Sequence, residues 1–300
     1  MGYQIKKKYL DDEVISYIDA AGSNAQAGAQ SYTDAQISTE AAARAAAEAV
    51  KMGTSACDLM DRRLLSIARE TDASYARLIP STAEAMLLIE TMGDRTWEVR
   101  ERLRAVVQRI HSEQRMAFDF RIAATQDELE WYWRLTNQVV ARLYSLRGES
   151  RPLPFVEDFA VPPETLPDFI GRLQNVLKNH HVTATLFGHA GHGQLHVRPF
   201  LDVRSASDLR RMSDLALELY QEVLAVGGTI SGEHGIGLVQ QEYMPIVFDP
   251  VTLQLQREIK KLFDPNLILN PGKIEIPALF QRTVVTSAVV SASKASEMSR

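Results

Sequence analysis

The segment V-T-A-T-L-F-G-H-A-G-H-G-Q-L-H-V-R-P-F, residues 182–200, decides the fold. Its two flanks, 182–187 and 194–200, are apolar segments of strand length. A short glycine-rich turn lies between them, which is typical of neighbouring strands in an antiparallel sheet. We therefore expect a pair of strands that carries histidines at its turn.

The rest of the chain predicts helices that alternate irregularly with further strands. Extended segments are expected at 83–90, 115–122 and 153–161. Periodicity and helix-end signals predict helices at 38–49, 55–70, 95–111, 126–146, 166–178, 205–226 and 250–263. No G-x-G-x-x-G fingerprint follows a strand. We predict an α+β fold, with an antiparallel sheet covered by helices on one face and a helical C-terminal portion.

Composition divides the chain into one large domain with two polar ends. Residues 38–277 form the predicted domain, preceded at 1–37 by a linker or loosely ordered lead-in. Residues 278–300 are rich in Ser, Ala and Thr without a period, and we expect a disordered tail there.

The overall composition excludes several classes of function. With 45% hydrophobic residues and a net charge of −5, the chain is typical of soluble globular proteins and unlike nucleic-acid binders. No apolar run is long enough for a transmembrane segment, and no secretory signal is present. We predict a cytoplasmic protein, with any membrane association peripheral and through a partner. Cys57 is the sole cysteine, so any metal must be held by His, Asp or Glu.

Three of the seven histidines lie within the turn segment, at His189, His192 and His196. A tight turn can place the imidazoles of His189 and His196 side by side, and neutral imidazole is a strong ligand for Zn²⁺ and similar ions. A surface loop with incidental histidines is the alternative interpretation.

Two later segments add chemistry to this turn. The first, G-G-T-I-S-G-E-H-G-I-G at 227–237, supplies a carboxylate, Glu233, and a titratable base, His234. Two histidines and one carboxylate leave coordination positions open, as in catalytic metal sites. The second, F-D-P-N-L-I-L-N-P-G-K at 263–273, indicates by itself only a turn, since Asn, Pro and Gly are the usual turn formers.

Together, these three motifs in this order resemble the C-terminal half of FAD-linked oxidases of the vanillyl-alcohol-oxidase superfamily. That group includes glycolate oxidases, D-lactate dehydrogenases and D-2-hydroxyglutarate dehydrogenases. The resemblance spans about residues 45–276 and includes A-E-A-M-L-L-I-E at 83–90 and F-V-E-D-F-A-V-P at 155–162. H-V-R-P-F-L-D at 196–202 resembles the large members fused to an iron–sulfur domain. The resemblance as a whole implies a ferredoxin-like cap that binds substrate and metal.

The resemblance also implies roles for individual residues. His189, His196 and Glu233 match the ligands of a divalent metal, Zn or Mn, and His234 matches the catalytic base beside the flavin. Glu233, His234, Asn270 and Lys273 fall where the family approaches FAD. In W-x-x-R at 131–134, Arg134 matches a residue that binds the substrate carboxylate, whereas alignment on Trp133 places Thr136 there instead. The implied reaction moves a hydride from the α-carbon of a D-2-hydroxy acid to FAD.

The chain departs from the family pattern in two ways. His192-Gly193-Gln194 stands where Asp-Gly-Asn is common, so His192 is an extra ligand, a hydrogen-bond partner or a subfamily variant. The FAD-binding domain that precedes this half in the family is missing from this sequence, so we expect either a separate FAD-binding or iron–sulfur subunit as partner or a fragment of a longer protein. A non-enzymatic metal-binding remnant or regulatory module is the alternative, and a metal-dependent hydrolase is a third hypothesis.

Overall fold

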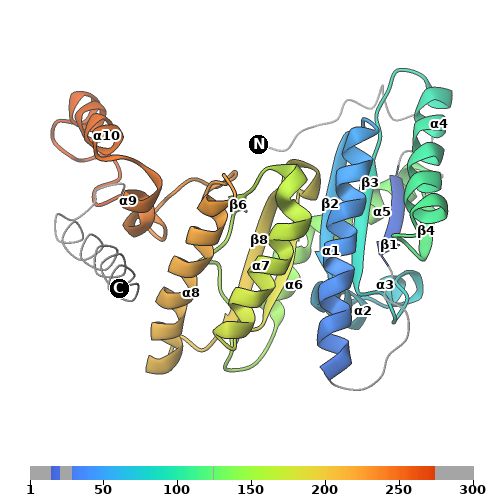
Figure 1. The fold of residues 1–300 in the computed structure, drawn as a ribbon, viewed down its shortest axis with the longest axis horizontal. Coiled ribbons are helices and arrows are strands. Elements are labelled where there is room, and N and C mark those ends of the chain that lie inside the picture. Colours follow the sequence, from blue (N-terminus) through green and yellow to red (C-terminus); the bar gives the residue numbers. More distant parts are fainter. Residues whose placement is uncertain (1–14, 21–28, 124, 274–300) are drawn as a thin grey trace, which may run out of the picture. The chain divides into compact units, whose positions relative to one another are not determined.

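The protein divides into two compact units, with the boundary between Gly232 and Glu233. A computed structural model describes residues 15–20, 29–123 and 125–273 (Figure 1). The predicted tail at 278–300 lies outside these residues. Among the described residues, none of the helices combines the length and apolar character needed to cross a bilayer.

The first unit is built on an antiparallel sheet. Its strands are β1 Ile15–Ala20, β2 Ala56–Asp61, β3 Ala85–Glu90, β4 Asp119–Ile122, β5 Arg151–Pro152, β6 Phe159–Ala160, β7 Ala184–Gly188 and β8 Gln194–Leu201. The order across the sheet is β4-β1-β3-β2-β7-β8-β5, and β6 pairs with β8. Every pairing is antiparallel, including β7 with β8 around the histidine turn. The predicted antiparallel α+β architecture is therefore confirmed.

Helices cover both faces of this sheet, not one as predicted (Figure 1). The first unit contains α1 Ala29–Lys51, α2 Arg62–Thr71, α3 Ala73–Leu78, α4 Thr96–Val107, α5 Gln126–Asn137, α6 Val139–Ser145, α7 Leu166–Asn179 and α8 Ala206–Ala225. The turn at Gly191 packs on Cys57 and α1 on one face. Met60, Phe187 and Leu88 join the core formed with α2, α3, α5 and α6 on the other face. Strands β2, β3, β7 and β8 are therefore largely buried on both sides, and all six residues of β3 are buried.

Two segments differ from the predicted elements. Ile15–Ala20 lies in the expected lead-in, yet forms β1 between β3 and β4, since Ile and Tyr favour strands where partners flank them. The helix expected at 55–70 is instead strand β2 followed by helix α2. Asp61 separates them, because its side chain caps α2 by accepting a hydrogen bond from the Leu64 N–H.

The second unit is small and helical. It contains α9 Met244–Val247 and α10 Pro250–Phe263, the latter within the bounds expected from the sequence. Asp249 caps α10 by accepting hydrogen bonds from the N–H groups of Val251 and Thr252. The predicted helical C-terminal portion is thus present.

Candidate functional site

The β7–β8 hairpin places His189 and His196 on neighbouring strands. His189 follows the last residue of β7, and the chain returns through a 3₁₀ turn at Ala190–His192. Gly193 closes the turn with φ of 71°, and a Cβ there would lie 1.9 Å from the Val161 carbonyl oxygen. Only glycine therefore fits at this position. In β8, His196 pairs with Phe187 of β7.

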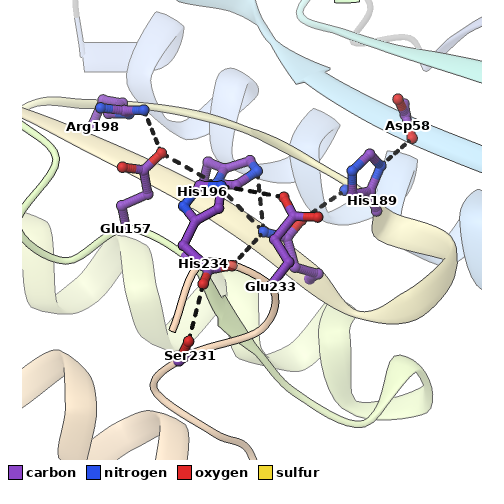
Figure 2. Close-up of polar contacts among 10 residues, drawn as sticks. Asp58, Glu157, His189, His196, Arg198, Ser231, Glu233 and His234 are labelled. Atoms are coloured by element: carbon purple, nitrogen blue, oxygen red, sulfur yellow. Dashed lines mark hydrogen bonds and ion pairs between the residues drawn. The ribbon is translucent and has the colours of Figure 1, made fainter. Parts of the chain in front are cut away.

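The two imidazoles lie beside each other, as the sequence predicted for a tight turn. Their ring centroids are 6.5 Å apart and the planes are inclined by 73°. The side chain of His189 is about half exposed, at 47%. Its Nδ1 lies 2.8 Å from Oδ1 of Asp58, on the neighbouring strand β2 (Figure 2). A carboxylate in this position fixes the ring and leaves Nε2 as the atom that would face an ion.

His196 is buried within a polar cluster. Its ring lies 4.9 Å from that of Phe187, and its Nδ1 is 3.4 Å from Oε1 of Glu157. Glu157 also forms an ion pair with the buried guanidinium of Arg198 (Figure 2). The side-chain nitrogen of Gln194 lies 3.1 Å from Nε2 of His196. His196 is therefore held by groups on β8 and on the segment that precedes β6.

His192, the third histidine of the turn, is exposed on the 3₁₀ turn. The hairpin brings His189 and His196 together because they flank the turn, whereas His192 lies within it. Of the three interpretations of His192 given above, the one in which it is only a subfamily variant agrees with this exposed position.

A cavity of about 230 Å³ opens beside the two histidines. The sheet contributes Asp58, Leu59, Met60, Phe187, Gly188, His189 and His196, and the α5–α6 junction contributes Trp133, Thr136, Asn137, Val139 and Val140. The helix breaks at Gln138, between α5 and α6, so residues on both sides of the break reach the cavity. The volume lies below the roughly 300–1,000 Å³ of pockets for drug-sized ligands and suits a small molecule.

Arg134 is exposed on α5 and does not line this cavity, whereas Trp133 and Thr136 do. The placement favours the alternative alignment, in which Thr136 occupies the position three residues after the matching tryptophan. The indole Nε1 of Trp133 donates a hydrogen bond of 2.8 Å to Glu90. Burial raises the pKa of the Glu90 carboxyl, and the nearby Asp58 carboxylate adds to the shift.

The glycine-rich segment at 227–232 is fixed against the strand that precedes the hairpin. Thr229 and Ala160 exchange both backbone hydrogen bonds, and the Gly232 N–H donates to the Asp158 carbonyl at 2.7 Å. A Cβ at Gly232 would lie 2.8 Å from Cγ of Gln194, so a side chain cannot be accommodated there. The first unit thus ends beside Gln194, which is two residues along β8 from His196.

Glu233 and His234 begin the second unit. His234 Nε2 lies 3.6 Å from Oε1 of Glu233, and both side chains are about half exposed. Asn270 and Lys273 lie in the turn after α10, where Lys273 Nζ is 3.4 Å from Oδ1 of Asn270. Both are exposed.

Asp264 organises that turn. Its carboxylate accepts hydrogen bonds from the N–H groups of Ile268 and Leu269 and pairs with Lys260 of α10. The ammonium of Lys260 is the main cause of the lowered pKa of Asp264. The conformation of the F-D-P…N-P-G-K motif therefore depends on its aspartate as well as on turn-forming residues.

Sequence reasoning missed the partners that hold the histidines. Asp58 falls within the helix expected at 55–70. Its carboxylate lies inside the apolar run at 57–60, and this placement indicates a polar partner elsewhere in the chain, since unpaired buried carboxylates are rare. Glu157 and Arg198 lie in motifs that contribute only to the family resemblance. Their ion pair spans 41 positions of sequence, and no local pattern marks it.

The donors of the first unit suit a divalent ion of the zinc or manganese type. Two imidazoles that bind one tetrahedral ion at about 2.1 Å have ring centroids roughly 5.3 Å apart, so these two rings would have to approach by about 1 Å from the observed 6.5 Å to share an ion. Carboxylate partners orient both rings, as is usual for ligating histidines. Nitrogen and oxygen donors without thiolate fit Zn²⁺ and Mn²⁺ better than soft ions.

The first unit is thus an antiparallel sheet between two helical layers, with two histidines beside a small cavity. Residues 35–274 match the family described as FAD linked oxidases, C-terminal domain. The chain belongs to that family, as its motifs predicted.

Its curated relatives include D-2-hydroxyglutarate dehydrogenases and a glycolate oxidase subunit. The chain is 30% identical over 250 residues to a D-2-hydroxyglutarate dehydrogenase of Haemophilus influenzae, covering 80% of this chain and 24% of that protein. It is 29% identical to the glycolate oxidase subunit GlcD of Bacillus subtilis, covering 67% of this chain and 41% of that protein. The chain thus spans about a quarter to two fifths of the length of these relatives.

The fold also recurs among solved structures. A 4-ethylphenol oxidase from Gulosibacter chungangensis superposes with a TM-score of 0.59 at 13% identity, covering 88% of this chain and 54% of the oxidase. A p-cresol methylhydroxylase gives a TM-score of 0.54 at 14% identity, covering 89% of this chain and 53% of that chain. At these identities the likeness establishes the fold alone.

Proposed function

We propose that this chain is the substrate- and metal-binding half of a flavin-dependent 2-hydroxy-acid dehydrogenase. FAD is held mostly by a separate domain or subunit. The observation that carries the proposal is the pair of carboxylate-oriented imidazoles, His189 and His196, beside a small cavity in a member of the FAD-linked oxidase family.

His189 and His196 supply two metal ligands, and Glu233 supplies the third. The support for Glu233 is chain connectivity. Gly232 is fixed beside Gln194 and Asp158, and the next Cα lies about 3.8 Å further along the chain. A divalent ion held by these residues would supply Lewis-acid chemistry that favours loss of the substrate hydroxyl proton.

His234 removes the substrate hydroxyl proton. Imidazole is the side chain that most often acts as a general base in enzymes. FAD would supply the acceptor for the hydride that leaves the α-carbon. Asn270 and Lys273 approach the flavin from the turn that Asp264 organises. For the substrate carboxylate, Arg134 is the residue that the family pattern suggests, but the cavity lining favours Thr136.

Calorimetric titration with Zn²⁺ and Mn²⁺ tests the metal assignment. We expect tight binding by the full chain, loss of binding in His196→Ala and retention in His192→Ala. His181→Asn is the matched control, because His181 is exposed with φ of 53°, a conformation that Asn tolerates. Equal metal uptake by the wild type and His196→Ala would remove the basis of the proposal.

Turnover tests the flavin requirement. We expect no dehydrogenase activity from the chain alone, and dye reduction by D-lactate, glycolate or D-2-hydroxyglutarate after addition of an FAD-domain partner. A chain that binds metal but gives no flavin-dependent turnover with any partner would favour the non-enzymatic alternative. Ester cleavage without flavin would favour a hydrolase.

A further inference from the structure

The cavity beside His189 and His196 carries a specific charge pattern. Its lining includes one carboxylate, Asp58, and two neutral polar side chains, Thr136 and Asn137. Neither Lys nor Arg occurs among the described residues that line it. The remaining wall is apolar, with Met60, Trp133, Val139, Val140 and Phe187 among its members.

Negative groups lie close to this wall. Asp58 is only 6% exposed, and Glu90 behind Trp133 is likewise buried at 6%. The indole N–H of Trp133 is directed to Glu90, so it does not serve as a donor toward the cavity. A carboxylate placed here would lose its hydration, gain no cation and face two carboxyl groups, all of which oppose binding.

The two buried arginines in the described part of the first unit, Arg142 and Arg198, have other partners, and Arg134 is exposed on α5 and does not line the cavity. Arg142 of α6 hydrogen-bonds to Thr71 and Gln138 and lies over the ring of Tyr75. Arg198 is paired with Glu157. Neither lines the cavity, and each would leave a buried polar group unpaired if it moved there.

We infer that this cavity receives an apolar side chain of the 2-hydroxy acid and selects against substrates with a second carboxylate. The inference rests on the proposed function, because His189 and His196 define which end of the cavity holds the hydroxyl and carboxylate oxygens. The side chain then extends toward Met60, Val139 and Val140. Monocarboxylic 2-hydroxy acids with branched or linear aliphatic side chains are the substrate class, although a relative at 30% identity is a D-2-hydroxyglutarate dehydrogenase.

Calorimetry on the zinc-loaded full chain compares D-2-hydroxy-4-methylpentanoate with D-2-hydroxyglutarate, which is similar in size but carries the second carboxylate. We expect the aliphatic acid to bind more tightly by about tenfold or more. In Val140→Lys, the preference should move toward D-2-hydroxyglutarate by about tenfold, because an ammonium group would then pair with its distal carboxylate. Equal or tighter binding of D-2-hydroxyglutarate by the wild type would overturn the inference.

Val140 and Leu217 provide a matched pair of lysine variants. Both are 40% exposed on helices, but only Val140 lines the cavity. Leu217→Lys should leave the preference unchanged, and a shift equal to that of Val140→Lys would count against the assignment. If Val140→Lys does not fold, Asn137→Lys makes the same test from an exposed lining position.

Metal uptake, measured first, separates this inference from the proposed function. Zinc binding with no heat from either acid would refute the cavity assignment and leave the metal site in place. Absence of zinc uptake would refute the metal site, while the relative binding of the two acids would still be measurable as a test of the cavity.

Discussion

Oδ1 of Asp58 lies 2.8 Å from Nδ1 of His189, across two strands whose residues are 131 positions apart in sequence. Asp58 is nearly buried, whereas the imidazole is about half exposed. A buried carboxylate thus holds an accessible ring in one orientation. This is the arrangement by which proteins fix the tautomer of a ligating histidine.

Replacement of Asp58 tests that relationship. We expect Asp58→Ala to weaken Zn²⁺ binding by about 10–100-fold, since the partner that orients His189 is lost. Calorimetric titration measures the change. Asp168→Ala is the control, because the side chain of Asp168 is 83% exposed on α7. Unchanged affinity in Asp58→Ala would show that the hydrogen bond plays no part in holding an ion.

Gly193 is expected to be indispensable for the hairpin. Its φ of 71° disfavours any side chain, and a Cβ would collide with the carbonyl oxygen of Val161. Gly53 is a matched control, with φ of 76° and open space around its Cβ position. Gly53→Ala should cost about 1–2 kcal/mol from backbone strain, and Gly193→Ala about 1–3 kcal/mol more from the collision. Urea denaturation measures both, and equal costs would contradict the expected clash.

Elements with strong local signals were predictable from the sequence. Helix α10 begins at a proline and ends where the apolar period stops, and β7 and β8 flank a glycine-rich turn. The pairing of His189 with His196 followed from that turn. Local sequence was sufficient in these cases because the interactions that define each element lie within a few residues of it.

Other elements depend on partners that are distant in sequence. Apolar residues at helical spacing from Leu59 onward predict a helix at 55–70, yet the first part of this segment pairs with β3 and β7 as a strand. The sheet supplies both neighbours, so tertiary pairing overrides the local preference. The contacts of Asp58 and Glu157 with the histidines arise in the same way. The apolar neighbours of Asp58 indicate that its carboxylate needs a partner, but no local pattern identifies His189 as that partner.

Asp61 connects the start of α2 to strand β7. Its carboxylate caps the helix at Leu64 and accepts hydrogen bonds from Thr185 Oγ1 at 2.7 Å and the Leu186 N–H at 2.8 Å. We expect Asp61→Ala to lower the free energy of unfolding by about 2–4 kcal/mol, since it removes a cap and leaves buried donors unsatisfied. Thermal or urea denaturation gives the value.

Asp72→Ala separates the two contributions to that loss. Asp72 caps α3 through the Ser74 N–H but makes no such link to the sheet. Its replacement should cost only about 0.5–2 kcal/mol. Equal losses in the two variants would mean that the contacts of Asp61 with β7 contribute nothing to stability.

Glu90 predicts a pH-dependent stability with a defined sign. Burial raises the pKa of its carboxyl above the usual value of about 4.3, so the folded state binds this proton more tightly than the unfolded state. Its contribution to stability is complete below the unfolded pKa and is lost as the pH rises through the folded pKa.

Glu90→Gln keeps a side-chain oxygen that can accept the Trp133 hydrogen bond but removes the titration. The variant should therefore gain stability relative to the wild type as the pH increases from about 4 toward neutrality. Urea denaturation midpoints at a series of pH values measure this difference. A constant or shrinking difference would show that the carboxyl of Glu90 ionises in the folded protein as readily as in water. The hydrogen bond between Glu90 and Trp133 would then have to form in an environment far more polar than the 6% exposure of Glu90 implies.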